Sequence, residues 1–182
     1  NYAENILRWA NERPDSPALI GLHETAQREE ISWKELVGQV GALAQHFRAR
    51  GVRPGDVVCA VLPNIPQTVV ALLATASVGA IWTVVNTDFG THGVKERFEQ
   101  LQPKVLLTTD SVHFGGKLVD KTSQLPELLE ALPTVEHHVL VDTDVDSGTT
   151  LPAASARLSD ILTSPQEPDF TRVEFNSPLW VL

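Results

Sequence analysis

Short apolar runs alternate along most of this chain with longer segments whose apolar residues recur every three or four positions. Runs of the first kind are typical of strands buried on both faces, and segments of the second kind are typical of helices that pack on a sheet. This alternation predicts an α/β fold with a doubly wound, largely parallel sheet and flanking helices. The expected strands are 57–62, 81–85, 105–109 and 139–142, and the expected helices begin near Asn64, Thr91 and Leu125.

The first part of the chain predicts a helix followed by a short N-terminal β-hairpin. Apolar residues at helical spacing run from Tyr2 to Arg13, and two strand patterns follow at 18–22 and 28–32. Ser32 is followed three residues later by a glutamate, which is the spacing of a capping box at a helix start. We therefore expect the next helix to begin at Ser32 and to end at Gly51.

Composition changes after Asp142, where Asp, Ser, Thr, Gly and Pro dominate as far as Ser164. This composition predicts a surface connection with one short helix over 156–161, and a last apolar stretch at 179–182 predicts a strand. We expect one incomplete domain, in which 1–142 form an α/β subdomain and 143–182 form a surface connection.

Composition and charge indicate which partners and which cellular compartment to expect. The chain is 42% hydrophobic and 20% charged, which is typical of a globular domain. Its net charge of −9 is spread along the chain, so duplex nucleic acid is not an expected partner. The single cysteine, Cys59, lies in an apolar run and is expected to be a core residue, which favours a reducing compartment. With no signal peptide and no clean apolar span, we expect a cytoplasmic protein without a membrane partner.

Candidate chemistry is sparse when the residues are considered alone. Neither the G-x-x-x-x-G-K-[ST] nor the G-x-G-x-x-G phosphate motif occurs. His137 and His138 would point to opposite faces of a strand, as a surface and a semi-buried residue, so no metal site is expected. Ligands of parallel sheets bind at the carboxyl ends of the strands, so a site is expected at loops 63–64, 86–93 or 110–117.

One loop carries a composition suited to a phosphate. Phe114-Gly115-Gly116-Lys117 follows an expected strand, its two glycines would let the backbone approach a ligand closely, and its lysine could neutralise a phosphate. Considered alone, the same composition is more often that of a surface loop.

Several stretches together resemble the acetoacetate–CoA ligases (acetoacetyl-CoA synthetases) of the adenylate-forming superfamily. The resemblance covers residues 1–142 well and residues 143–182 loosely. The stretches that carry it are Asn1-Tyr2-Ala3-Glu4-Asn5-Ile6-Leu7, Leu62-Pro63-Asn64-Ile65-Pro66, the stretch 71–82 that ends in Gly79-Ala80-Ile81-Trp82, Asp88-Phe89-Gly90, Pro103-Lys104-Val105-Leu106 and Phe114-Gly115-Gly116-Lys117.

This resemblance implies a two-step ligase. Acetoacetate and ATP, with Mg²⁺, would give an acyl-adenylate and pyrophosphate, and the thiol of CoA would then give acetoacetyl-CoA and AMP. The ATP loop of these ligases follows a stretch like Pro178–Leu182, where this chain ends. We therefore expect an N-terminal fragment that holds no catalytic residue, binds none of these cofactors tightly and is inactive alone.

The resemblance also implies which residues bind CoA. In related acetyl-CoA synthetases, the turn matching Phe114, Gly115, Gly116 and Lys117 contacts the nucleotide end of CoA, and the stretch matching Asn86, Thr87 and Asp88 lies beside it. The acetyl enzymes carry an aromatic residue and two glycines at this second stretch, so the sequence departs from their pattern there.

Two alternatives and one question stay open. The intact protein could act on acetate, propionate or another short acid, because residues 1–182 hold little of the expected acyl pocket. The chain could also be a non-catalytic α/β binding module. The sequence leaves the oligomeric state undetermined.

Overall fold

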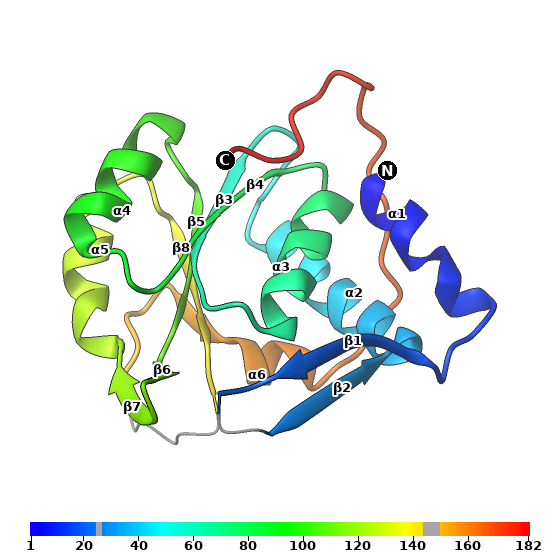
Figure 1. Cartoon of the computed structure of the whole chain (residues 1–182). Coiled ribbons are helices and arrows are strands. Elements are labelled where there is room, and N and C mark those ends of the chain that lie inside the picture. The colour runs from blue at the N-terminus through cyan, green and yellow to red at the C-terminus, as the bar shows by residue number, and fades with distance from the viewer. Residues whose placement is uncertain (25–26, 144–149) are drawn as a thin grey trace.

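The computed structural model describes residues 1–24, 27–143 and 150–182. Its centre is a five-stranded parallel sheet in the order β4-β3-β5-β8-β9, with helices on both faces (Figure 1). The sheet strands are β3 (Val57–Val61), β4 (Ile81–Val85), β5 (Val105–Thr109), β8 (His137–Val141) and β9 (Ser155–Arg157). The helices are α1 (Tyr2–Leu7), α2 (Trp33–Ala49), α3 (Pro66–Ser77), α4 (Thr91–Phe98), α5 (Leu125–Ala131) and α6 (Leu158–Leu162), with short 3₁₀ turns at Arg8–Asn11, Glu99–Leu101 and Thr122–Gln124.

Strand β3 shows why both faces of the sheet need covering. All five of its residues are buried, and successive side chains point to opposite faces. Val58 and Ala60 join the larger core, to which α1, α2 and α3 contribute. Cys59 and Val61 join the smaller core, which α4 and α5 complete. The expected doubly wound α/β fold is therefore confirmed.

The strand order places the reversal of chain direction at β3. From β3 the chain passes through α3 to β4 on one side, and then through α4 to β5 on the other side. Loops that leave the carboxyl ends of such neighbouring strands diverge and open a crevice, where doubly wound sheets bind ligands. The carboxyl ends of β3 and β5 are therefore the place to look for a site.

The N-terminal part is close to its prediction. Strands β1 (Pro17–Leu22) and β2 (Arg28–Ser32) form the expected antiparallel hairpin. Both halves of the capping box form, because Glu35 N–H donates to the Ser32 hydroxyl and Ser32 N–H donates to the Glu35 carboxylate. The helix expected over 2–13 is α-helical only as far as Leu7 and continues as a 3₁₀ turn.

Three expectations about local structure were wrong. The helix expected over 156–161 begins only at Leu158, because Ser155–Arg157 form the edge strand β9. Asn64 does not cap α3: Ile65 occupies the N-cap position without a side-chain hydrogen bond, and Pro66 begins the helix. The strand expected at 179–182 is reduced to one parallel bridge between Trp82 and Trp180.

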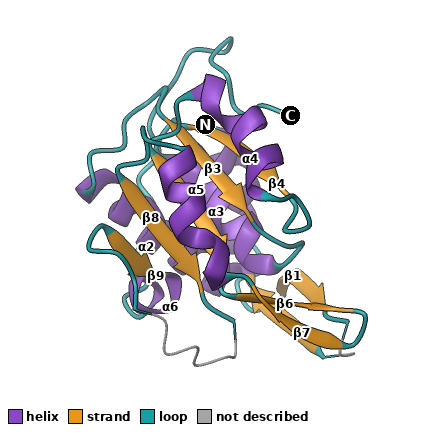
Figure 2. Cartoon of the chain, turned by 90° about the vertical axis from the view of Figure 1, so that its left-hand side faces the viewer, coloured by secondary structure: helices purple, strands orange, loops and turns teal. Residues whose placement is uncertain are grey.

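The segment expected to be a loop over 110–117 is largely a second hairpin. Strand β6 (Ser111–Phe114) pairs with β7 (Lys117–Asp120), and Gly115 and Gly116 form the two-residue turn between them. Figure 2 shows this hairpin extending beyond the end of the sheet, near β1. The phosphate-binding candidate therefore lies at the tip of a projecting hairpin.

The segment after α6 crosses α2 at a glycine. A Cβ built on Gly41 would lie 1.8 Å from the carbonyl oxygen of Gln166, so no side chain fits unless the crossing segment moves. The segment is also anchored by Gln166 N–H, which donates to the Gly38 carbonyl oxygen. Gly41 is thus required by close packing and not by its backbone conformation.

We predict that Gly41→Ala destabilises the chain, by about 1–3 kcal/mol, because the added methyl group overlaps backbone atoms. Helix propensity alone predicts the opposite, a gain of about 1 kcal/mol. Urea unfolding followed by circular dichroism distinguishes the two signs. A stabilised Gly41→Ala variant would contradict the crossing.

His138 was expected to be semi-buried and is fully buried, at 2% exposure. Its Nε2 lies 2.8 Å from the Thr108 hydroxyl and its Nδ1 lies 2.9 Å from the Ser155 hydroxyl, so the ring joins β5, β8 and β9. Burial lowers the pKa of His138 to about 4. The ring is therefore neutral at physiological pH and serves the packing of the sheet.

This burial predicts a specific dependence of stability on pH. Above pH 6.5 the ring is neutral in both states, but between pH 6.5 and about 4 only the unfolded chain binds the proton. His138 should therefore cost about 3 kcal/mol of stability over that interval as the pH falls. In His138→Gln the fall in unfolding free energy should be smaller by this amount. Parallel curves for His138→Gln and the parent chain would contradict the prediction.

Candidate functional site

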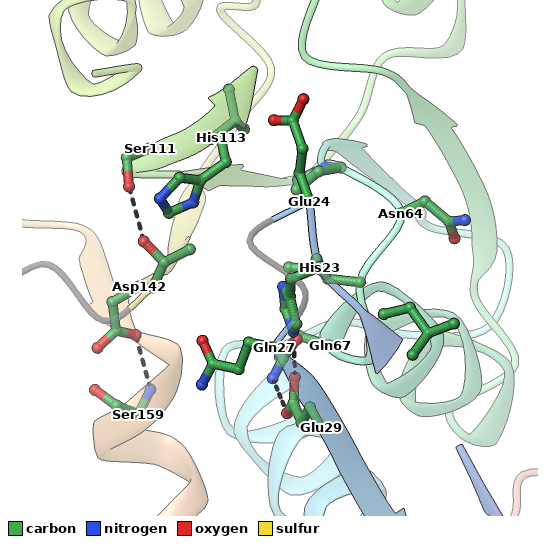
Figure 3. Close-up of a pocket in the computed structure, with 15 residues that line it drawn as sticks. His23, Glu24, Gln27, Glu29, Asn64, Gln67, Ser111, His113, Asp142 and Ser159 are labelled. Carbon is green, nitrogen blue, oxygen red and sulfur yellow. Dashed lines mark hydrogen bonds and ion pairs between the residues drawn. The ribbon is translucent and has the colours of Figure 1, made fainter. Parts of the chain in front are cut away.

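A polar pocket lies where the chain direction reverses in the sheet (Figure 3). Its volume is about 660 Å³. One wall is the loop after β3, from Pro63 to Ile65, and a second wall is formed by β6 and the end of β8. The turn between β1 and β2 supplies the third wall. The pocket thus occupies the crevice that the strand order predicts.

Hydrogen bonds hold the polar side chains of the pocket. Glu29 accepts a hydrogen bond from the Gln67 amide at 2.9 Å, and its second carboxylate oxygen lies 3.3 Å from His23 Nε2. On the opposite wall the Ser111 hydroxyl lies 2.8 Å from the Thr143 hydroxyl. The buried Asp110 carboxylate fixes this second pair, because it accepts hydrogen bonds from the backbone N–H and the hydroxyl of Thr143 and lies 3.2 Å from the Ser111 hydroxyl.

The chemistry of this pocket does not suit a phosphate. Its lining consists of carboxylates, imidazoles, amides, hydroxyls and a few apolar residues, without any lysine or arginine among the described residues. Phosphate recognition needs cationic side chains or free backbone N–H groups. None of the predicted CoA-binding residues lines the pocket either. The pocket and the predicted site are therefore neighbouring but distinct features.

The predicted phosphate-binding turn has the backbone geometry that its glycines allow. Gly115 and Gly116 have φ values of +59° and +74°, and nothing lies within 4 Å of a Cβ built on either residue. Two successive positive φ values in a two-residue loop are typical of a type I′ turn, which glycine favours strongly. Phe114 is 76% exposed, and Lys117 is also exposed. The tip therefore presents open backbone, an aromatic ring and an ammonium group to solvent.

One contact joins this tip to the pocket wall. Gly115 N–H donates a hydrogen bond of 3.0 Å to the carboxylate of Glu24, which lies in the turn between β1 and β2. Glu24 also lines the pocket, as does His113 of β6 (Figure 3). The two hairpins thus meet through a carboxylate and a glycine N–H group.

A second contact joins the hairpin to the loop after β4. The ammonium group of Lys121 donates a hydrogen bond of 2.8 Å to the Thr87 carbonyl oxygen. The backbone N–H of Lys121 donates to the Asp110 carbonyl oxygen at 2.7 Å, which fixes the end of the hairpin to β5. Thr87 is buried, whereas Asn86 and Asp88 face solvent. Lys121 therefore ties the loop that carries Asn86 and Asp88 to the base of the hairpin, at the end away from its Gly115–Gly116 turn, and leaves these two side chains accessible.

Other reactive groups of the described residues are unsuited to catalysis. Burial raises the pKa of the Cys59 thiol, so it is a protonated core residue, as expected. No group of three or more His, Cys, Asp or Glu residues in the described parts is placed to hold a metal ion. Within the same residues, no helix is both long and apolar enough to cross a bilayer.

Sequence reasoning pointed to loops 63–64 and 110–117, which line part of the pocket, but missed its other walls and the contact between the hairpins. The pocket residues come from five separate parts of the chain, and their types alone carried no motif. One signal was available for the second hairpin, since Gly-Gly between two short strands is a hairpin pattern. Glu24 and Gly115 are 91 residues apart, and no pattern in the sequence predicts their contact.

Comparison with known families agrees with the fold. The model of the family described as "AMP-binding enzyme" matches residues 6–173. The chain belongs to this family.

Its relatives point to one branch of the family. A solved structure of the acetoacetyl-CoA synthetase from Streptomyces lividans matches all of this chain with a TM-score of 0.94 and 45% identity. The acetoacetyl-coenzyme A synthetase of Rhizobium meliloti (strain 1021) is 37% identical over the whole chain. A malonamoyl-CoA synthetase of Penicillium aethiopicum is 32% identical. The chain spans 28% of the length of the first two proteins and 27% of the third.

Proposed function

We propose that this chain is part of an AMP-forming acid–thiol ligase that makes acetoacetyl-CoA from acetoacetate, ATP and CoA. The observation that supports this most strongly is the 45% identity and TM-score of 0.94 to an acetoacetyl-CoA synthetase over the whole chain. The doubly wound fold and the exposed glycine turn agree with the resemblance in sequence. A cytoplasmic location accords with the single, buried and reduced cysteine.

Within this ligase, the proposed role of the chain is to bind the nucleotide end of CoA. Phe114, Gly115, Gly116 and Lys117 would form the binding surface, because backbone N–H groups and an ammonium group recognise phosphate. The exposed ring of Phe114 offers a face on which adenine can stack. Asn86 and Asp88 would border the nucleotide, with Lys121 holding their loop in place through the Thr87 carbonyl oxygen.

ATP is not assigned to the described residues. They contain no group that fits Mg²⁺ and no glycine-rich triphosphate motif. We therefore expect ATP, Mg²⁺ and the adenylation step to depend on residues outside this chain, and the chain alone to be inactive. Pyrophosphate release by the isolated chain from acetoacetate and ATP would contradict this expectation.

A second candidate function concerns the acid. One relative is a malonamoyl-CoA synthetase, and malonamate, like acetoacetate, is a short carboxylate with a carbonyl group at C3. An acyl pocket with a hydrogen-bond donor for that carbonyl would accept both acids. Acetate and propionate lack the group, so a pocket that uses it would reject them.

The choice of acid predicts a ranking of kcat/KM in the complete protein at saturating ATP and CoA. Acetoacetate should exceed acetate by at least about 100-fold, because an unpaired buried polar group in the pocket is costly. Malonamate should lie between the two. A preference for acetate would move the protein to the short-chain branch, and a preference for malonamate would support the second candidate.

The turn predicts a separation between the two half-reactions of the complete protein. An exposed contact between lysine and phosphate contributes about 1 kcal/mol, so Lys117→Ala should raise the KM for CoA several-fold, and less so at high salt. Gly116→Val should raise it further, because a β-branched residue is strained at a φ of +74°. Exchange between ATP and pyrophosphate without CoA should be unchanged in both variants. Equal damage to exchange and to thioester formation would mean that the turn is structural.

A further inference from the structure

The N–H group of Gly115 already holds an anion of the protein itself. It donates to the Glu24 carboxylate, which comes from the turn of the other hairpin. The positive φ of Gly115 and its open surroundings mean that the same donor would also be accessible to a ligand. A carboxylate and a phosphate make the same kind of charge-assisted hydrogen bond to a backbone N–H group.

We propose that Glu24 is an internal competitor of CoA: its carboxylate occupies the glycine turn in the free protein, and a phosphate of CoA displaces it. This inference rests on the proposed CoA site at the turn. Glu24 thereby sets the affinity for CoA from the hairpin opposite, although it belongs to no phosphate motif. The residue determines affinity through competition and takes no part in the chemical steps.

The charges around the turn favour such an exchange. Lys117 stands next to Gly116 and forms no ion pair within the described residues, so its ammonium group is available to a phosphate. Hydrogen bonds from Thr122 lower the pKa of Asp120, so this carboxyl at the end of β7 remains ionised and stays engaged with Thr122. Glu24 is therefore the anion that contacts the donor of the turn.

The exchange is energetically feasible because Glu24 is exposed. Its carboxylate regains water when it leaves, so the contact with Gly115 has only a small net free energy. A phosphate carries more negative charge than a carboxylate and also gains Lys117. Removal of the competing charge should lower the KM for CoA by about three- to ten-fold, which is the range expected for one exposed charge-assisted hydrogen bond.

A purely structural role of Glu24 predicts the opposite sign. If the carboxylate served only to hold the tip of the hairpin in place, its loss would loosen the turn and weaken CoA binding. The direction of the change in KM therefore distinguishes competition from support. Removal of any nearby acidic group would also favour an anionic ligand slightly, so the test needs a control for this general effect of charge.

The test uses the complete protein, with KM for CoA measured at saturating acetoacetate and ATP in Glu24→Gln and Glu24→Ala. Both variants should show the fall of about three- to ten-fold, shrinking at high salt, with ATP–pyrophosphate exchange unchanged. Glu130→Gln is the matched control, because it removes the same charge from an exposed position on α5. It should change the KM for CoA by less than about two-fold.

An unchanged or raised KM in the Glu24 variants overturns the proposal, and so does an equal fall in Glu130→Gln. Lys117→Ala in the same assay tests the CoA site at the turn separately from the competition by Glu24. If Lys117→Ala raises the KM but the Glu24 variants do not lower it, the turn binds CoA without a competitor. If Lys117→Ala has no effect, the assignment of the CoA site to the turn is wrong, and so is the proposed role of Glu24.

Discussion

The rest of the structure depends on the parallel pairing of β3 with β4 on one side and β5 on the other. Because every residue of β3 is buried, this strand supplies both cores and fixes the helices on both faces. The same pairing brings the carboxyl ends of the three strands to one edge of the sheet. The pocket, the loop that carries Asn86 and the β6–β7 hairpin are all consequences of that arrangement.

This edge divides into two surfaces with different chemistry. The pocket between the hairpins presents carboxylates and imidazoles, whereas the tip of β6–β7 presents the Gly115–Gly116 turn, whose Gly115 N–H donates to Glu24, and the ammonium group of Lys117. A phosphate is favoured only at the tip, which is why we assign the nucleotide end of CoA to it and not to the larger cavity. Glu24 belongs to both surfaces, since it lines the pocket and bonds to Gly115. Affinity for the ligand at the tip therefore depends on a residue from the other hairpin.

The buried sheet could be predicted from the sequence, and the exposed elements could not. The strands at 81–85 and 105–109 have the predicted bounds, because a continuous apolar run between turn residues has few other solutions. Strand β7 was missed because all four of its residues are exposed, so its sequence shows no hydrophobic period. Asn64 was expected to cap α3 from its residue type, but Ile65 takes the cap position and Asn64 lines the pocket. For the site, the resemblance supplied the turn, whereas the contact with Glu24 joins residues far apart in the chain and needed coordinates.

The most direct test is a crystal structure of the complete protein with CoA bound. We expect a phosphate oxygen of CoA within about 3 Å of Gly115 N, with Lys117 beside it and the Glu24 carboxylate displaced from the turn. A nucleotide bound elsewhere, with the bond between Glu24 and Gly115 intact, would contradict both the assignment of the turn and the competition at its tip.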